Sequence, residues 1–218
     1  MAGTFIIGEK KTRPGVYQRR YKTGSVVAGA RNGIGLGLIR ANWGPLNTVV
    51  DFTPDTNVSR IFGSGNTEGL ITEMFTGGLT SGHFVRIGTG GTAPTITLKD
   101  SADTDVVKIT GAYVGDRAFT VSIRDSLTGA GRECIFYEGT TEFCKVAFEA
   151  GEKEPDALIA AMKEATTDFI ATKLADGSGT MKECTQTAMT PGTQPTASPV
   201  EYSAGLDALY CVFGNCLC

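Results

Sequence analysis

The alternation of apolar and polar positions in the first half of the chain predicts short strands around one helix. Three apolar runs between residues 25 and 52 predict strands, and the turn-forming sequences RNGIG and WGPL separate them; the runs are SVVAGA, GLGLIRAN and NTVVDF. Residues 66–75 place apolar side chains at helical spacing, and Gly77-Gly78 follow. HFVRIG (83–88) is typical of a strand. Strand, helix and strand in this order predict an α/β layer.

From residue 92 onward the pattern becomes mainly β. Alternating segments between Gly, Asp and Ser turns predict five strands, namely ITLKD, DVVKITGAY, AFTVSIRD, ECIFYEG and EFCKVAFEA. Residues 155–165 predict a short amphipathic helix with Pro155 in its first turn. Two more strands are expected between residues 168 and 189.

The last part of the chain predicts a loop, a helix and a strand. Residues 190–205 have the composition of a loop, and Ser203 is the expected cap of the helix that follows. The final CVFGNCLC has the apolar content of a buried strand. A helix followed by an apolar strand opens another layer, so we expect this sequence to be the front part of a longer fold.

Charge is distributed unevenly along the chain. The 218 residues carry a formal net charge of −3, but residues 1–40 carry +7 and the remainder −10. The basic residues lie in an extended, Gly-interrupted segment, and the acidic body would repel phosphate. This favours an acidic protein surface, such as another copy of the chain, over nucleic acid. A solvated tail is the alternative. No apolar run is long enough to predict a membrane span.

Residues 1–24 predict an extended N-terminal arm. Pro14 fixes one φ angle, and the residue before a proline avoids the helical region. No partner strand is close in sequence. Such a terminal strand either frays or joins the edge of another sheet.

Candidate chemistry is sparse, and we expect no catalytic, cofactor or metal site. His83 is the single histidine, and no Walker A sequence occurs. Gly33-x-Gly35-x-Gly37 lacks the spacing of a dinucleotide loop and favours a turn or close strand packing. Asp100, Asp103 and Asp105 lack the glycine and closing glutamate of a calcium loop. Ser126 and Ser203 have no histidine partner in a known motif.

The six cysteines lie late in the sequence, and without a signal peptide they are expected to be reduced thiols. A metal-binding knuckle formed by the last three is the weaker alternative. They are Cys134, Cys144, Cys184, Cys211, Cys216 and Cys218.

Four segments in order resemble the tail sheath proteins of contractile phage tails and tailocins. The most specific is Arg13-Pro14-Gly15-Val16-Tyr17. A strand region at 25–63 follows, with WGPLNTVVDF and RIFG, and then EGLITEMFTGG with HFVRIG. The last is TPGTQPTASPVEYSAGLDAL, a loop and helix by which the chain returns to the core.

The resemblance implies an α+β fold divided into four parts. These are an extended arm at 1–24, the first part of an α/β core at 25–91, an inserted mainly β domain at 92–189 and a return to the core at 190–218. By this resemblance, we expect the C-terminal domain of sheath proteins to be missing from this sequence.

The resemblance also implies a structural, non-enzymatic subunit of a virion or tailocin, assembled in the bacterial host cytoplasm. Such subunits stack in rings around a tail tube and contract to drive the tube through a cell envelope. Their partners would be other copies, the tube protein, and the baseplate and tail terminator proteins. The arm would add a strand to a neighbour: Pro14 and Gly15 set its direction, Val16 and Tyr17 anchor it, and Arg13, Arg19 and Arg20 meet acids. The alternative function is a soluble β-rich binding module, such as a glycan adhesin.

Overall fold

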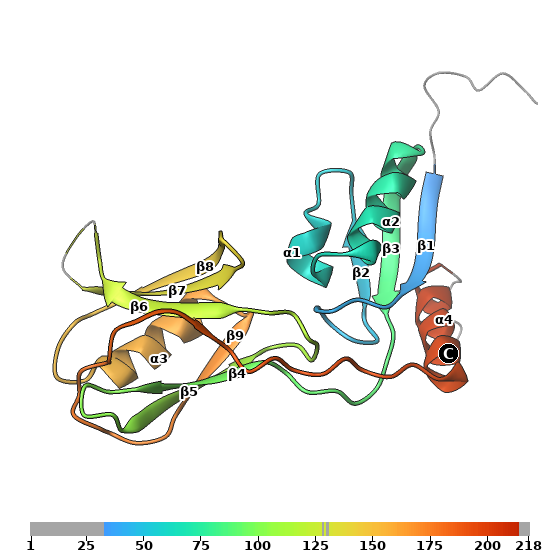
Figure 1. Ribbon diagram of the computed structural model, residues 1–218. Coiled ribbons are helices and arrows are strands. Elements are labelled where there is room, and N and C mark those ends of the chain that lie inside the picture. Colours follow the sequence, from blue (N-terminus) through green and yellow to red (C-terminus); the bar gives the residue numbers. More distant parts are fainter. Residues whose placement is uncertain (1–32, 128, 130, 214–218) are drawn as a thin grey trace, which may run out of the picture. The chain divides into compact units, whose positions relative to one another are not determined.

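The computed structural model describes residues 33–127, 129 and 131–213 (Figure 1). Within this part, ten strands and four helices form a small α/β layer and a larger β-rich part. The α/β layer consists of β1 (Gly33–Ile39), β2 (Val49–Phe52), α1 (Val58–Phe62), α2 (Asn66–Thr76), β3 (Leu79–Arg86) and α4 (Pro199–Phe213). Of the helices described, none combines the length and apolar character needed to cross a membrane.

The α/β layer is built around β3, the central strand of a sheet with the order β1-β3-β2. β1 pairs with β3 in parallel, and β2 pairs with β3 antiparallel. Because successive side chains of a strand point to opposite faces, β3 serves two cores. Phe84 packs in the cluster that contains residues of α1 and α2, whereas Val85 packs with Leu209 of α4. The predicted α/β layer is therefore confirmed.

Two sequence predictions in this region are wrong. The strand region predicted at 25–63 contains a helix, because the Asn57 side chain accepts a hydrogen bond from the Arg60 backbone N–H and so caps α1. Val58 and Phe62 then lie on one buried face, four residues apart. The turn predicted at RNGIG is also wrong over Gly33–Gly35, which belong to β1.

The β-rich part contains two antiparallel sheets and one helix. The first sheet has the order β4 (Thr95–Lys99), β5 (Asp105–Gly111) and β9 (Phe169–Lys173). The second has the order β10 (Cys184–Ala188), β6 (Thr120–Asp125), β7 (Arg132–Glu138) and β8 (Thr141–Phe148). α3 (Glu154–Ala165) packs on β8 and β9. Apolar residues of both sheets and of α3 form one continuous core.

Trp43 joins the two parts, because it comes from the β1–β2 loop but is buried in the core of the β-rich part. Its ring centroid lies 5.3 Å from that of Tyr113 and 5.1 Å from that of Phe119. The core of the β-rich part is therefore completed by a side chain from the α/β layer.

Arg86, at the end of β3, makes a second connection. It is fully buried, and its guanidinium donates hydrogen bonds to the backbone carbonyls of Ala41, Gly44 and Val114 at 2.7–2.9 Å. Burial lowers the pKa of Arg86 to about 10, and nearby Asp116 opposes this shift. The arginine thus ties the loop before β6 to the loop after β1.

The C-terminal helix begins earlier than the sequence analysis predicted. Ser198, not Ser203, caps α4: its hydroxyl accepts a hydrogen bond from the Val200 N–H, and its own N–H donates to the Glu201 carboxylate at 2.8 Å. This is a capping box with proline in the first helical position. The strand predicted at CVFGNCLC is wrong over Cys211–Phe213, which form the last turn of α4, and the remainder lies outside the described residues.

Candidate interaction surface

The outer edge of β1 is open in the described part of the chain. The sheet order places β1 at an edge, where only β3 pairs with it. In this seven-residue strand, every second residue therefore points its backbone N–H and C=O groups away from β3, toward the open side. An edge of this length without a charged side chain is a place where another strand can add.

The glycines of β1 make room for neighbouring side chains on one face of the sheet. A Cβ atom on Gly35 would lie 2.7 Å from the Leu79 side chain, and one on Gly37 would lie 2.7 Å from the Phe84 ring. Leu79 and Phe84 can therefore lie across β1. The Gly-x-Gly-x-Gly pattern allows close strand packing, one of the two roles that the sequence suggested.

The opposite face of β1 borders an apolar groove beneath α4. The groove has a volume of about 430 Å³ and is lined by Leu36, Gly37, Leu38, Leu206, Asp207, Leu209 and Tyr210. Large apolar side chains remain exposed around it: Leu36 is 47% exposed, Leu206 58% and Tyr210 75%. Tyr202, Leu206 and Tyr210 are spaced four residues apart and form a stripe along α4. A contiguous exposed apolar surface of this kind marks an interaction site.

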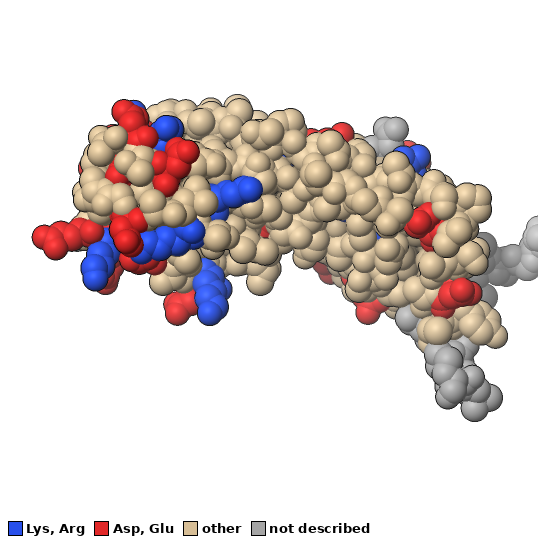
Figure 2. Space-filling model, turned by 90° about the horizontal axis from the view of Figure 1, so that it is seen from below, with Lys and Arg blue, Asp and Glu red and all other residues tan. Residues whose placement is uncertain are grey.

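Few charges border this groove. α4 carries two acidic residues, Glu201 and Asp207, and no basic residue. Figure 2 shows charged side chains of both signs gathered over the β-rich part, whereas the surface over α4 is mostly uncharged with isolated acidic side chains. The groove therefore suits an apolar occupant.

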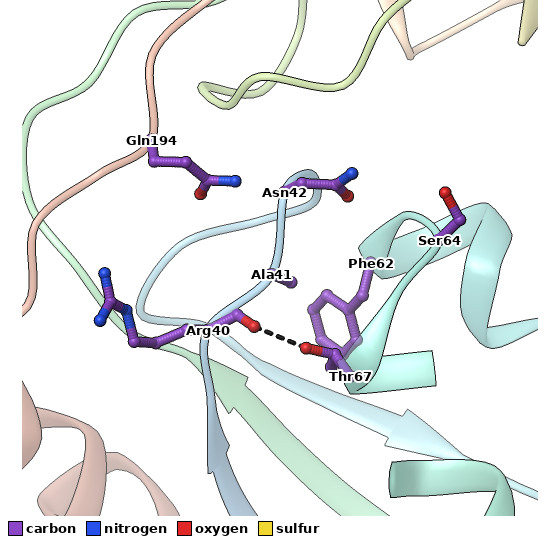
Figure 3. Close-up of a pocket in the computed structure, with 7 residues that line it drawn as sticks. All are labelled: Arg40, Ala41, Asn42, Phe62, Ser64, Thr67 and Gln194. Atoms are coloured by element: carbon purple, nitrogen blue, oxygen red, sulfur yellow. Dashed lines mark hydrogen bonds between the residues drawn. The ribbon is translucent and has the colours of Figure 1, made fainter. Parts of the chain in front are cut away.

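A second pocket, of about 340 Å³, lies where α2 begins, and its lining is more polar. The Thr67 hydroxyl donates to the backbone carbonyl of Arg40 at 2.5 Å. Figure 3 shows the Arg40 guanidinium and the Ser64 hydroxyl on opposite sides of the pocket. Because these polar groups do not converge, the pocket has no arrangement that would orient a ligand.

The structure gives Asp100 a structural role in a turn. Its carboxylate accepts hydrogen bonds from the backbone N–H groups of Ala102, Thr104 and Ser178 at 2.5–3.0 Å. These hydrogen bonds lower the pKa of Asp100 because they stabilise its charged form, and the bond from Ser178 has the largest effect. The carboxylate thus holds the β4–β5 turn against the segment before β10.

The other candidate residues are also engaged in the fold. The His83 Nδ1 atom lies 2.5 Å from the Asp51 carboxylate on the adjacent β2. The Ser126 hydroxyl donates to Glu133, and Ser203 lies inside α4. Cys134 is fully buried, and burial raises the pKa of its thiol. Among the residues that the structure describes, no three His, Cys, Asp or Glu side chains are grouped to hold a metal ion.

The predicted arm residues lie outside the described part, as do Cys216 and Cys218. The arm residues are Arg13, Pro14, Gly15, Val16, Tyr17, Arg19 and Arg20. The groove is not predicted by the sequence pattern. Two signals for it were present, the alternation in GIGLGLI and the four-residue spacing of Tyr202, Leu206 and Tyr210, but nothing in the sequence joined them.

Comparison with known proteins finds similarity at the level of structure. No family model matches the sequence, and no curated protein matches it significantly. The crystal structure of the sheath tail protein of Listeria innocua superposes with a TM-score of 0.65 at 14% identity, covering 84% of this chain and 39% of that protein. The sheath tail protein of Desulfitobacterium hafniense gives a TM-score of 0.63 at 16% identity, covering 91% of this chain and 43% of that protein.

The chain thus spans about two fifths of the length of these solved structures. The match confirms the predicted α+β fold class and the resemblance to sheath proteins at the level of the fold. The described chain has the fold of the corresponding part of the sheath tail proteins.

Proposed function

We propose that this chain is a structural, non-enzymatic part of a contractile tail sheath subunit. The observation that carries the proposal is the fold match to two sheath tail proteins over 84% and 91% of this chain. The Arg-Pro-Gly-Val-Tyr motif at residues 13–17, which resembles the N-terminal signature of sheath proteins, supports the proposal from the sequence.

The proposed assembly is a lattice of copies linked by their arms. Strand addition supplies backbone hydrogen bonds whatever the side chains are. In this arrangement, Val16 and Tyr17 bind apolar positions on the neighbour, while Arg13, Arg19 and Arg20 pair with acids. Residues 1–40 carry +7 and the remainder −10. This opposite charge favours contact between the basic region of one copy and the acidic region of another copy.

Contraction in such a lattice needs no active site. Two packings of the same subunits differ in free energy. Once the sheath is released at a baseplate, the packing of lower free energy spreads along the tail. Each contact can be modest because repetition multiplies it. The proposed partners are other copies, the tail tube, the baseplate and the tail terminator, within a virion or tailocin particle assembled in the host cytoplasm. Residues 92–189 are proposed to form a domain that faces outward.

Negative-stain electron microscopy of the purified chain, with and without residues 1–20, tests the arm. We expect linked rings or tubes for the full chain. The shortened chain should keep its circular dichroism spectrum but not form linked assemblies. Normal tubes from the shortened chain would contradict the role of the arm.

A charge-reversal pair separates specific contacts from overall charge. Arg13, Arg19 and Arg20 are replaced together by Glu in one variant, and Lys10, Lys11 and Lys22 in its control. Both variants change the net charge of the arm equally. We expect the first to lose assembly at a salt concentration where the control still assembles. Equal loss in both would indicate only general attraction.

A further inference from the structure

The direction of α4 determines what can follow it in the fold. Thr196 pairs with Thr89, just beyond the carboxyl end of β3, and α4 begins three residues later at Pro199. Later in the helix, Leu206 and Tyr210 reach the groove beside Leu36, in the middle of β1. α4 therefore runs back along the sheet, antiparallel to β1 and β3, and its carboxyl end points toward their amino ends.

A strand that follows α4 would consequently run parallel to β1. β1 and β3 are already a parallel pair, and α4 packs mainly on these two strands, with Val49 of β2 at the border of the same cluster. A strand–helix–strand connection is right-handed, and its second strand lies in the same sheet as the first. Because α1 and α2 pack on one face of the sheet and α4 on the other, a right-handed connection from β3 through α4 leads toward β1 and not toward β2. The open edge of β1 is the position that remains.

The exposed surface has the composition that such a strand would cover. Ile34 and Leu36 are 59% and 47% exposed, although parallel sheets are normally buried on both faces. Leu206 and Tyr210 of α4 line the groove beside β1 and are 58% and 75% exposed. The two solved sheath proteins are matched over less than half of their length, so that fold contains further polypeptide to supply a strand.

We propose that the outer edge of β1 and the groove under α4 bind one further β-strand. The strand runs parallel to β1, carries apolar side chains toward Leu206 and Tyr210, and belongs to the part of the sheath fold that this chain does not span. The proposal depends on the fold and not on the sheath function.

A tethered strand tests this proposal directly. The chain is extended at Cys218 by a Gly-Ser linker of about ten residues, which holds the added strand at an effective millimolar concentration. The strand is Thr-Val-Thr-Val-Thr-Val-Thr, which matches the seven residues of β1. The matched control carries Pro in place of each Val, because proline cannot donate to a ladder. Hydrogen exchange of residues 33–39 is the measurement.

We expect the Val strand to slow exchange of the β1 amides at least about tenfold relative to the Pro control. Leu206→Lys, an exposed position where folding should persist, should reduce this protection. Equal exchange with Val and Pro strands would overturn the proposal. So would a dimer of the unextended chain in which the β1 amides are already protected, because a second copy would then occupy the edge.

Discussion

Single buried side chains connect regions that are far apart in the sequence. Trp43 follows β1 but packs against Tyr113 and Phe119 of the β-rich part. Arg60 of α1 forms an ion pair with Asp168 at 2.6 Å and lies 3.6 Å above the Phe143 ring. Because these contacts cross between the α/β layer and the β-rich part, losing one should weaken both.

Replacement of Trp43 tests this connection. Trp43→Ala removes a fully buried indole, and we expect it to lower the free energy of unfolding by about 3–5 kcal/mol. Urea unfolding followed by circular dichroism measures the change. Tyr210→Ala is the matched control; with 75% of its side chain exposed, it should cost less than about 0.5 kcal/mol. Similar losses in both variants would contradict the role given to Trp43.

Asp100 should give the protein an acid-sensitive turn. The hydrogen bonds from Ser178, Thr104 and Ala102 lower its pKa in the folded chain. The stabilisation is therefore complete above the unfolded pKa, about 3.9, and is lost as the pH falls through the lower folded value. We expect Asp100→Asn to be less stable than the wild type at pH 6, and the gap to narrow toward pH 3. A gap independent of pH in urea titrations would contradict this assignment.

At the scale of elements, the boundaries of helices depend on capping groups as much as on apolar spacing. α4 begins at Pro199 because the Ser198 hydroxyl accepts from the Val200 N–H, while the Ser198 backbone N–H and hydroxyl both donate to the Glu201 carboxylate. These hydrogen bonds from Ser198 also lower the pKa of Glu201. Likewise, the Asn57 side chain caps α1, which begins at Val58.

The two serines near the start of α4 provide a matched pair of variants. Ser198→Ala removes the cap and should destabilise the helix by about 1 kcal/mol. Ser203→Ala lies inside the helix, where alanine is the better helix former, and should be neutral or slightly stabilising. Hydrogen exchange of the α4 amides measures both. Equal effects would mean that the helix begins nearer Ser203.

A buried ion pair attaches α3 to the second sheet. The Arg132 guanidinium lies 2.9 Å from the Glu154 carboxylate, and both side chains are about 5% exposed or less. Arg132→Leu leaves a buried carboxylate with its main charge partner missing, and we expect a loss of about 3–5 kcal/mol in chemical denaturation. The double variant Arg132→Leu, Glu154→Leu should recover most of it. A double variant as unstable as the single one would show that the arginine acts through packing alone.

At the scale of the whole molecule, local patterns could be predicted and distant contacts could not. The pattern of residues 66–75 predicts α2 almost completely. This is possible because the apolar spacing, with Leu70 and Ile71, and the glycines that follow it all lie within one short segment. The groove joins residues 36–38 to residues 206–210, and only the folded sheet brings them together. The apolar residues after Ser203 predict a helix start there, whereas the capping box of Ser198 and Glu201 sets the start of α4 at Pro199.

The proposed sheath role concerns the particle, so the most direct test is made on particles. Tail particles are purified from cells that produce the protein and labelled with gold-conjugated antibodies against residues 33–213. We predict label along the full length of the tail shaft, and a shorter labelled region on contracted tails. Label absent from the shaft, or confined to the tail tip or head, would contradict the assignment as a sheath subunit.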